Sequence, residues 1–253
     1  MHACPICEKA EWLTIYQIQD WDILQCKCCK FAHISPFPDP SSRADFYSKA
    51  EITYRVLKKK RGMVKLVAAY IRRFFRKIFG HKKGAIFSER LKFYLCKGDR
   101  ILDIGCGSGA VLREVCNYYK CTGVEISTYL ATETRKLGVE VLTGDFFNID
   151  FKERRFDGIT MVSLLEHLPN PVDSLKKCYN LLEDNGILLL KTVNHEGLNR
   201  RILGIKWSGY RPPDHMVYFG PDNLKIILYK IGFSHVIIRA NIFNDSFYCE
   251  VKK

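Results

Sequence analysis

A glycine-rich turn between an apolar segment and a helical segment constrains this chain more than any other feature. The turn spans residues 103–109, which read Asp-Ile-Gly-Cys-Gly-Ser-Gly, and it follows the apolar residues Ile101 and Leu102. Glycines let the backbone approach a ligand closely, and the helix that follows offers unpaired N–H groups. This order of strand, turn and helix indicates a nucleotide-binding α/β unit.

From residue 98 onward, short apolar segments alternate with helical ones, which is typical of a parallel sheet covered by helices on both faces. Strands are predicted at 100–104, 121–125, 140–143, 156–162, 186–192, 234–240 and 246–251. Helices are predicted at 110–119, 128–137, 172–182 and 221–231. The last two strands are expected to form an antiparallel hairpin. We therefore predict an α/β fold, with a doubly wound, Rossmann-like and mostly parallel seven-stranded sheet.

An acid about twenty positions beyond the turn supports this interpretation. Glu125 ends the second predicted strand, where its carboxylate can accept hydrogen bonds from both ribose hydroxyls of a nucleoside. Gly105-x-Gly107-x-x-Ala110 also fits a variant dinucleotide fingerprint. Asp103 argues against a dinucleotide, because its carboxylate would repel a pyrophosphate but suits an ammonium group.

Residues 103–109 resemble the first motif of the class I S-adenosylmethionine-dependent methyltransferases, Asp-x-Gly-x-Gly-x-Gly. The resemblance continues at residues 144–146 and 156–171, and it covers roughly residues 98–253. It implies that S-adenosylmethionine is the cofactor. The residues expected to line this cofactor are Asp103, Gly105, Cys106, Gly107, Glu125, Ile126, Asp145, Phe146 and Ser163.

Two of these residues have a specific role in the resemblance. It places Asp145 at the exocyclic amine of adenine and Phe146 against the ring. Each has an alternative interpretation, since Asp145 could cap a turn and Phe146 could belong to the core. Their order and spacing together favour cofactor binding.

Methyl transfer from a sulfonium is an in-line displacement, so the protein mainly positions the acceptor and removes its proton. His167 follows the fourth predicted strand, at the sheet edge where such folds bind ligands. It is the leading candidate for a general base. A histidine bonded to a backbone carbonyl at a helix start is the competing interpretation.

The connection at 194–220 is too long for a plain connector and is rich in aromatic and basic residues. Its segment His215-Met216-Val217-Tyr218-Phe219 resembles a His-x-x-Tyr-Phe element of the same family. We expect this connection to recognise the acceptor, with His215 and Tyr218 as catalytic candidates. Alternatively, Tyr218 and Phe219 anchor the connection onto the core.

The N-terminal cysteines have the spacing of a structural zinc site. Cys4-x-x-Cys7 and Cys26-x-x-Cys29 form two pairs that can close a tetrahedron of thiolates, with Cys28 as a spare. Iron and disulfides are less favoured. A metal-stapled ribbon before a proline-rich linker resembles a subset of bacterial methyltransferases that act on small biosynthetic intermediates, including sugar and lipid-linked ones.

The net charge of +13 is concentrated in residues 55–83, which contain twelve Lys or Arg and no Asp or Glu. The segment has the pattern of a basic amphipathic helix. Three interpretations remain open: packing over the main domain with solvated charges, contact with an anionic membrane, and nucleic-acid binding, which is the least favoured.

The sequence thus predicts three regions: a zinc ribbon and linker at 1–40, a basic helical segment at 41–97 and a methyltransferase domain at 98–253. No apolar segment approaches the ~20 residues of a membrane-spanning helix, and the start lacks the layout of a signal peptide. We expect a cytoplasmic protein, for which peripheral contact at the inner membrane face through residues 55–83 is one of the open interpretations.

The expected activity is O-methylation of a small-molecule or lipid-linked acceptor. The alternative is an RNA-modifying or nucleic-acid-binding protein that docks through the ribbon and the basic helix.

Overall fold

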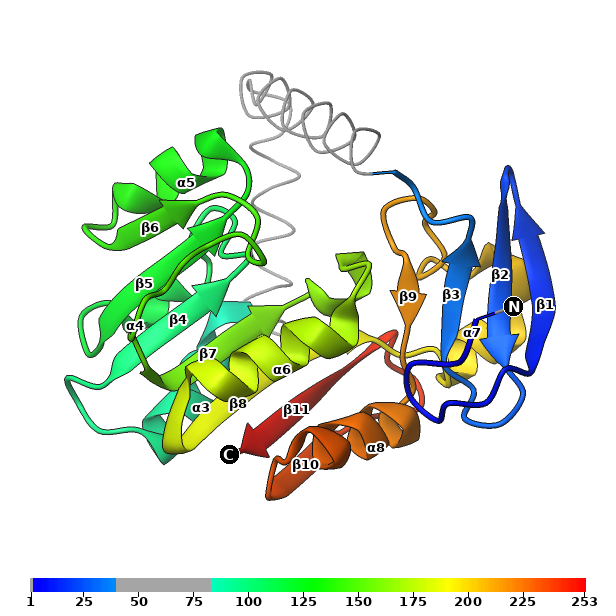
Figure 1. Cartoon of the computed structure of the whole chain (residues 1–253). Coiled ribbons are helices and arrows are strands. Elements are labelled where there is room, and N and C mark those ends of the chain that lie inside the picture. Colours follow the sequence, from blue (N-terminus) through cyan, green and yellow to red (C-terminus); the bar gives the residue numbers. More distant parts are fainter. Residues whose placement is uncertain (1, 40–82) are drawn as a thin grey trace.

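The computed structural model describes residues 2–39 and 83–253, which form two sheets that lie next to each other (Figure 1). The larger sheet has seven strands in the order β10-β11-β8-β7-β4-β5-β6. Its strands in chain order are β4 (Arg100–Ile104), β5 (Lys120–Glu125), β6 (Glu140–Thr143), β7 (Phe156–Val162), β8 (Leu182–Val193), β10 (His235–Arg239) and β11 (Ser246–Lys252).

The five neighbouring strands β8, β7, β4, β5 and β6 run parallel to one another. Strand β11 is antiparallel to both β8 and β10. Parallel neighbours need crossover connections, which here contain helices α4 (Leu112–Val115), α5 (Thr128–Arg135) and α6 (Pro171–Leu181). A further helix, α8 (Pro221–Ile231), precedes β10. The predicted doubly wound, mostly parallel sheet with a C-terminal antiparallel hairpin is confirmed.

One predicted helix is shorter than expected. The sequence predicts a helix at 110–119, but α4 ends at Val115 and turns follow it. The carbonyl of Tyr118 accepts the N–H of Gly98, at 2.8 Å, which draws this part of the chain toward the start of β4. Asn117, Tyr118 and Tyr119 also have weak helix propensity, so little opposes the turn.

Both faces of the larger sheet are buried, because helices cover each of them. On one face, Leu188 and Leu190 of β8 pack in a cluster with residues of α6 and α8, which lie in front of the sheet in Figure 1. On the other face, Ile187 and Leu189 pack with residues of α3 (Lys83–Tyr94) and α4. Neighbouring residues of one strand therefore serve two different core layers.

The smaller sheet is antiparallel and has the order β1-β2-β3-β9. Its strands are β1 (Trp12–Ile18), β2 (Trp21–Cys26), β3 (Ala32–Ser35) and β9 (Val217–Tyr218). We refer to residues 2–35 as the ribbon. Strand β9 comes from the long connection after β8, so a segment of the methyltransferase region completes the sheet of the ribbon (Figure 1).

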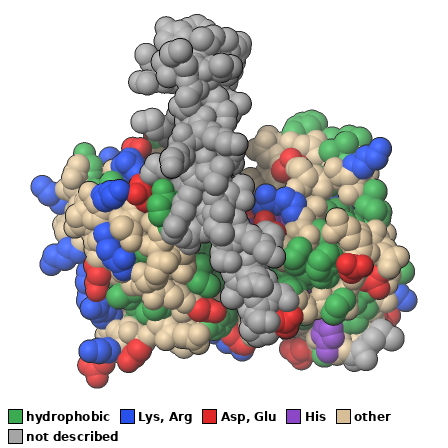
Figure 2. All heavy atoms as spheres, turned by 90° about the horizontal axis from the view of Figure 1, so that it is seen from above, with side chains coloured by type: hydrophobic (Ala, Val, Ile, Leu, Met, Phe, Trp, Pro, Cys, Tyr) green, Lys and Arg blue, Asp and Glu red, His purple; other side chains and the backbone are tan. Residues whose placement is uncertain are grey.

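The basic segment 55–83 lies outside the described residues except for its last position. Within residues 2–39 and 83–253, no helix is both long and apolar enough to cross a membrane. On the face shown in Figure 2, Lys and Arg side chains gather along the outer rim of the domain that contains the larger sheet.

Asn223 of α8 ties the ribbon to the larger domain and is fully buried. Its Nδ2 donates to the carbonyl of Cys29, at 3.1 Å, and its Oδ1 accepts the N–H of Gly220, also at 3.1 Å. Because Asn223→Ala leaves two backbone groups without these partners, we expect the free energy of unfolding to fall by about 1–3 kcal/mol. Urea or thermal unfolding measures this loss. Asn180→Ala, at an exposed position of α6, is the matched control and is expected to unfold like the wild type.

Candidate functional site

The carboxyl ends of β4 and β5 hold the two predicted acids of the cofactor site. Asp103, near the end of β4, is only 2% exposed. The hydroxyl of Thr160, on the adjacent strand β7, donates to its Oδ1 at 2.6 Å. Burial raises the pKa of Asp103 to about 7, against the opposing effect of the Thr160 hydrogen bond. A cationic partner would favour the charged carboxylate again, so this position suits an ammonium group.

The glycine-rich turn wraps around the second acid. Gly105, Gly107 and Gly109 have φ values of +69°, +55° and +77°, which other residues rarely adopt. The N–H of Gly107 donates to Glu125 Oε2 at 2.8 Å, and the N–H of Ser127 donates to Oε1 at 2.9 Å. A Cβ added at Gly107 would meet no heavy atom within 4 Å. The turn therefore faces open space at its centre, beside the Glu125 carboxylate.

The other predicted cofactor residues lie at the same edge of the sheet but differ in exposure. Cys106 is buried and Ile126 is 45% exposed. Ser163 follows β7 with a φ of +53°. The Oδ1 of Asp145 accepts a hydrogen bond from the backbone N–H of Phe147 at 2.9 Å, as in a turn cap. Phe146 packs in the hydrophobic core, so its ring has the environment that the core interpretation describes.

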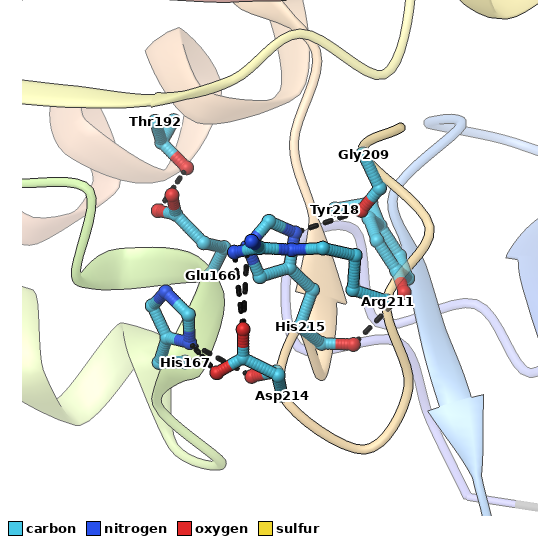
Figure 3. A network of polar contacts seen from close by, with 8 residues as sticks. All are labelled: Glu166, His167, Thr192, Gly209, Arg211, Asp214, His215 and Tyr218. Carbon is cyan, nitrogen blue, oxygen red and sulfur yellow. Dashed lines mark hydrogen bonds and ion pairs between the residues drawn. The ribbon is translucent and has the colours of Figure 1, made fainter. Parts of the chain in front are cut away.

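A polar network joins the end of β7 to the long connection (Figure 3). His167 ends the short helix η1 (Leu165–His167). Its Nδ1 lies 2.8 Å from Asp214 Oδ1 and also 2.8 Å from the Asp214 carbonyl oxygen. Arg211 contacts the other carboxylate oxygen, with Nη2 3.0 Å from Oδ2. Asp214 thus holds the ring of His167 and is itself held by a guanidinium.

Charges determine which histidine of this network can exchange a proton. Burial lowers the pKa of His167, but the hydrogen bond to Asp214 and the charges of Glu166 and Asp214 outweigh burial, so the pKa is raised. The same pairing keeps the pKa of Asp214 below its usual value despite burial. Because both acceptors on Asp214 face Nδ1, this nitrogen carries the proton when the ring is neutral. The lone pair is then on Nε2.

His215 has a different environment, although its ring lies only 4.7 Å from that of His167, measured between centroids. Its Nδ1 donates to the carbonyl of Gly209 at 2.7 Å, and its Nε2 faces the guanidinium of Arg211. Burial and the charges of His167 and Arg211 lower the pKa of His215 to about 4. Both ring nitrogens of His215 are therefore engaged, and the ring is neutral near pH 7.

Tyr218 and Glu166 complete the network (Figure 3). Tyr218 is fully buried, burial raises its pKa, and its hydroxyl donates to the carbonyl of His215 at 2.8 Å. Glu166 is 2% exposed and accepts the Thr192 hydroxyl at 2.8 Å. These contacts fix the shape of the connection. The structure therefore brings together all three predicted catalytic candidates, with only His167 presenting a nitrogen that has no hydrogen-bond partner in the described structure.

The four predicted metal ligands meet at one end of the ribbon. The Sγ atoms of Cys4, Cys7, Cys26 and Cys29 all lie within 4.8 Å of one another, and the two closest pairs are 3.5 Å apart. A disulfide requires about 2.05 Å, whereas a tetrahedron with Zn–S bonds of about 2.3 Å has edges of roughly 3.8 Å. The sulfur atoms therefore fit a tetrahedral metal ion, and the exposed Cys28 lies outside their group.

The two cysteine pairs sit in matching turns. In the first turn the N–H of Glu8 donates to the carbonyl of Cys4 at 2.8 Å, and in the second the N–H of Lys30 donates to that of Cys26 at 3.0 Å. Glu8 and Lys30 have nearly equal positive φ values of 65° and 64°. Two equivalent turns that aim thiols at one point are what a structural zinc site requires.

Sequence reasoning missed three residues of this site. Thr160 supports Asp103, Thr192 supports Glu166, and Asp214 supports His167. Each lies far from its partner in sequence. Only Asp214 carried a signal, because it directly precedes the predicted candidate His215 within the long connection.

Comparison with known proteins identifies the family of this chain. Residues 63–237 match the family described as methyltransferase domain. A ubiquinone biosynthesis O-methyltransferase of Coxiella burnetii is 32% identical over 105 residues, which cover 39% of this chain and 45% of the relative. A sterol 24-C-methyltransferase of Eremothecium gossypii is 27% identical over 195 residues, covering 68% of this chain and 51% of the relative. The chain thus spans about half the length of these curated relatives.

Solved structures agree on the fold. A magnesium protoporphyrin IX methyltransferase from Synechocystis superposes with a TM-score of 0.61 at 16% identity, covering 85% of this chain and all of the other. A methyltransferase from Archaeoglobus fulgidus superposes with a TM-score of 0.54 at 21% identity, covering 73% of this chain and all of the other. With the family match over most of its length, the chain belongs to the S-adenosylmethionine-dependent methyltransferases.

Proposed function

We propose that this protein transfers the methyl group of S-adenosylmethionine to an oxygen atom of a small-molecule acceptor. The observation that carries the proposal is the pair of buried acids around the glycine-rich turn. Asp103 takes the ammonium group of the methionine part, and Glu125 takes the ribose hydroxyls in place of its present backbone donors. Gly105, Gly107 and the neighbouring positions 106, 126 and 163 would line the nucleoside.

Proton removal from the acceptor is assigned to His167. Its Nδ1 is bound by Asp214, its pKa is raised, and its side chain retains 15% exposure. The Nε2 lone pair can therefore take a proton from an acceptor hydroxyl while Asp214 stabilises the charged ring that results. His215 and Tyr218 hold the connection that carries Asp214, and Asp145 and Phe146 shape the adenine end.

The acceptor class follows from the relatives and the chemistry of the site. Of the two curated relatives described above, one is named for O-methylation in ubiquinone biosynthesis and the other for 24-C-methylation of a sterol. A histidine base suits a hydroxyl acceptor. We therefore place the acceptor among small or lipid-linked biosynthetic intermediates. A cytoplasmic location remains a prediction from the sequence.

We also propose that Cys4, Cys7, Cys26 and Cys29 hold one structural zinc ion. Four thiolates leave no open position on a tetrahedral ion, so the metal would contribute to folding and take no part in methyl transfer. The ribbon would then be a rigid support for β9 and for the connection that carries Asp214.

Variants of the two buried acids test cofactor binding. Asp103→Asn and Glu125→Ala are each expected to weaken S-adenosylmethionine binding on the order of ten- to a hundredfold, because each removes a charged partner of the ligand. Isothermal titration calorimetry measures the affinities. Asp184→Asn, at an exposed acid, is the matched control. Unchanged affinity in both acid variants would refute the assignment of the cofactor site.

The raised pKa of Asp103 predicts a pH dependence of the same binding. Below a pKa of about 7 the carboxyl is protonated in the free protein, so an ammonium ligand must displace this proton. Affinity is therefore expected to weaken as pH falls from about 7.5 to 5.5, and this trend is expected to be smaller in Asp103→Asn. Equal pH slopes in the wild type and the variant would argue against the contact.

Asp214→Asn tests the role of His167 without knowledge of the acceptor. Loss of the carboxylate removes the contact that raises the pKa of His167, so its titration is expected to move to lower pH. NMR titration of the histidine ring protons measures this, with His167→Asn used to assign the signal. If the His167 titration is the same in Asp214→Asn as in the wild type, the proposed pairing is wrong.

Cysteine variants test the proposed zinc site. Cys29→Ser is expected to lower zinc content and the midpoint of thermal unfolding, because three thiolates hold the ion more weakly. Cys28→Ser is the matched control, since this exposed cysteine lies in the same turn but outside the sulfur group. Mass spectrometry of metal content compares the two. Zinc loss from both variants alike, or from neither, would contradict the assigned ligand set.

A further inference from the structure

Exposed apolar side chains gather on two short segments beside the ribbon. Twelve large apolar side chains are exposed in the part of the chain that the structure describes, and five of them lie within residues 198–206 and 240–245. They are Ile202, Leu203, Ile205, Ile242 and Phe243. Single exposed apolar residues are common on protein surfaces, but a group of this size marks an interaction surface.

Three of these five side chains are among the most exposed of the twelve. Ile202 is 71% exposed, Phe243 is 65% exposed and Ile242 is 61% exposed. Such side chains gain little from the fold of their own chain, since most of their area remains in water. A partner that removes them from water would gain the corresponding hydrophobic free energy.

Hydrogen bonds hold the two segments together. The first contains helix α7 (Leu198–Leu203), and the second is the turn between β10 and β11. The N–H of Leu198 donates to the carbonyl of Ile242 at 2.7 Å, and the Asn199 side chain donates to the carbonyl of Phe243 at 3.2 Å. The exposed apolar side chains of α7 and of the turn therefore lie on two segments that contact each other.

Helix geometry places two apolar residues of α7 on one face. Ile202 lies four residues after Leu198, so both project from one face of α7. Ile205 follows in the short helix η2 (Gly204–Lys206). Trp207 then fixes the end of the segment, because it is buried and its Nε1 donates to the carboxylate of Asp245 at 2.8 Å.

Three basic residues, Arg200, Arg201 and Lys206, lie in the first of these two segments. Arg200 is engaged within the protein, because its Nε donates to the Tyr210 hydroxyl at 3.1 Å and the acids Glu196 and Asp222 lie nearby. Arg201 and Lys206 are exposed. The acid of the neighbouring turn, Asp245, accepts hydrogen bonds from Trp207 and Asn199 and is engaged within the protein. Exposed Ile, Leu and Phe beside Lys and Arg are the composition of a segment that lies on an anionic membrane.

We propose that the surface formed by Ile202, Leu203, Ile205, Ile242 and Phe243 docks the protein on an anionic lipid membrane. The apolar side chains enter the boundary between headgroups and acyl chains, and the adjacent Arg and Lys side chains contact lipid phosphates. The same connection carries Asp214 and His215, so docking would bring the acceptor site close to the membrane. Docking itself does not depend on the proposed methyl transfer.

Sedimentation with lipid vesicles tests the proposal on the full chain. The wild type is expected to bind vesicles of phosphatidylcholine with about one third phosphatidylglycerol, and to bind more weakly in high salt or without the anionic lipid. The double variant Ile202→Ser with Phe243→Ser is expected to bind at least about tenfold more weakly. Phe93→Ser, which changes a 75% exposed side chain on α3, is the matched control.

Unchanged thermal unfolding and S-adenosylmethionine binding in the double variant would show that its fold and cofactor site are intact. Failure of the wild type to bind anionic vesicles would overturn the proposal. Equal binding by the wild type and the double variant would also overturn it, and would direct attention to residues 55–83. A wild-type dimer that the double variant dissociates would instead assign the surface to a second copy of the chain.

Discussion

The short ladder between β3 and β9 joins the ribbon to the long connection that carries Asp214. Ala32 pairs with Tyr218 and His33 pairs with Val217. Next to this ladder, the carbonyl of Met216 accepts the N–H of Ile34 at 2.9 Å, while the N–H of Met216 donates to the carbonyl of Glu166 at 2.8 Å. One residue thus bridges the ribbon and the end of β7. The position of the preceding Asp214 against His167 depends on this bridge.

Two carboxylates of this protein have pKa values that are shifted in opposite directions. Asp103 is buried with no Lys or Arg partner among residues 2–39 and 83–253, and its pKa is raised, whereas Asp214 is paired with His167 and Arg211 and has a lowered pKa. The surroundings of Asp103 suit a carboxylate that binds a cationic ligand, and those of Asp214 suit a carboxylate that orients a neighbouring side chain. The pKa values of two carboxylates in one protein therefore shift in opposite directions because their surroundings differ.

The parts of this fold that depend on local sequence were predictable. The glycine-rich turn, the strand ending in Glu125 and the two cysteine pairs each carry their own pattern within a few residues, and the structure has them in place. The pairing of β9 with β3 and the contact of Asp214 with His167 were not predictable, because they join segments far apart in the chain. The environment of Phe146 was likewise undecided, since either cofactor or core could take an aromatic ring.

The remote origin of β9 also governs the order in which the protein can assemble. The N-terminal ribbon leaves the ribosome long before residues 216–218, so the edge of β3 has no native partner during most of translation. A bare strand edge next to the apolar residues Phe31 and Ile34 is a site for wrong pairing between nascent chains. Early binding of the proposed zinc ion by the four cysteines of the ribbon would limit how far this edge can move. Completion of the polar network around Asp214 must then be among the last steps of folding, as expected for contacts of high sequence separation.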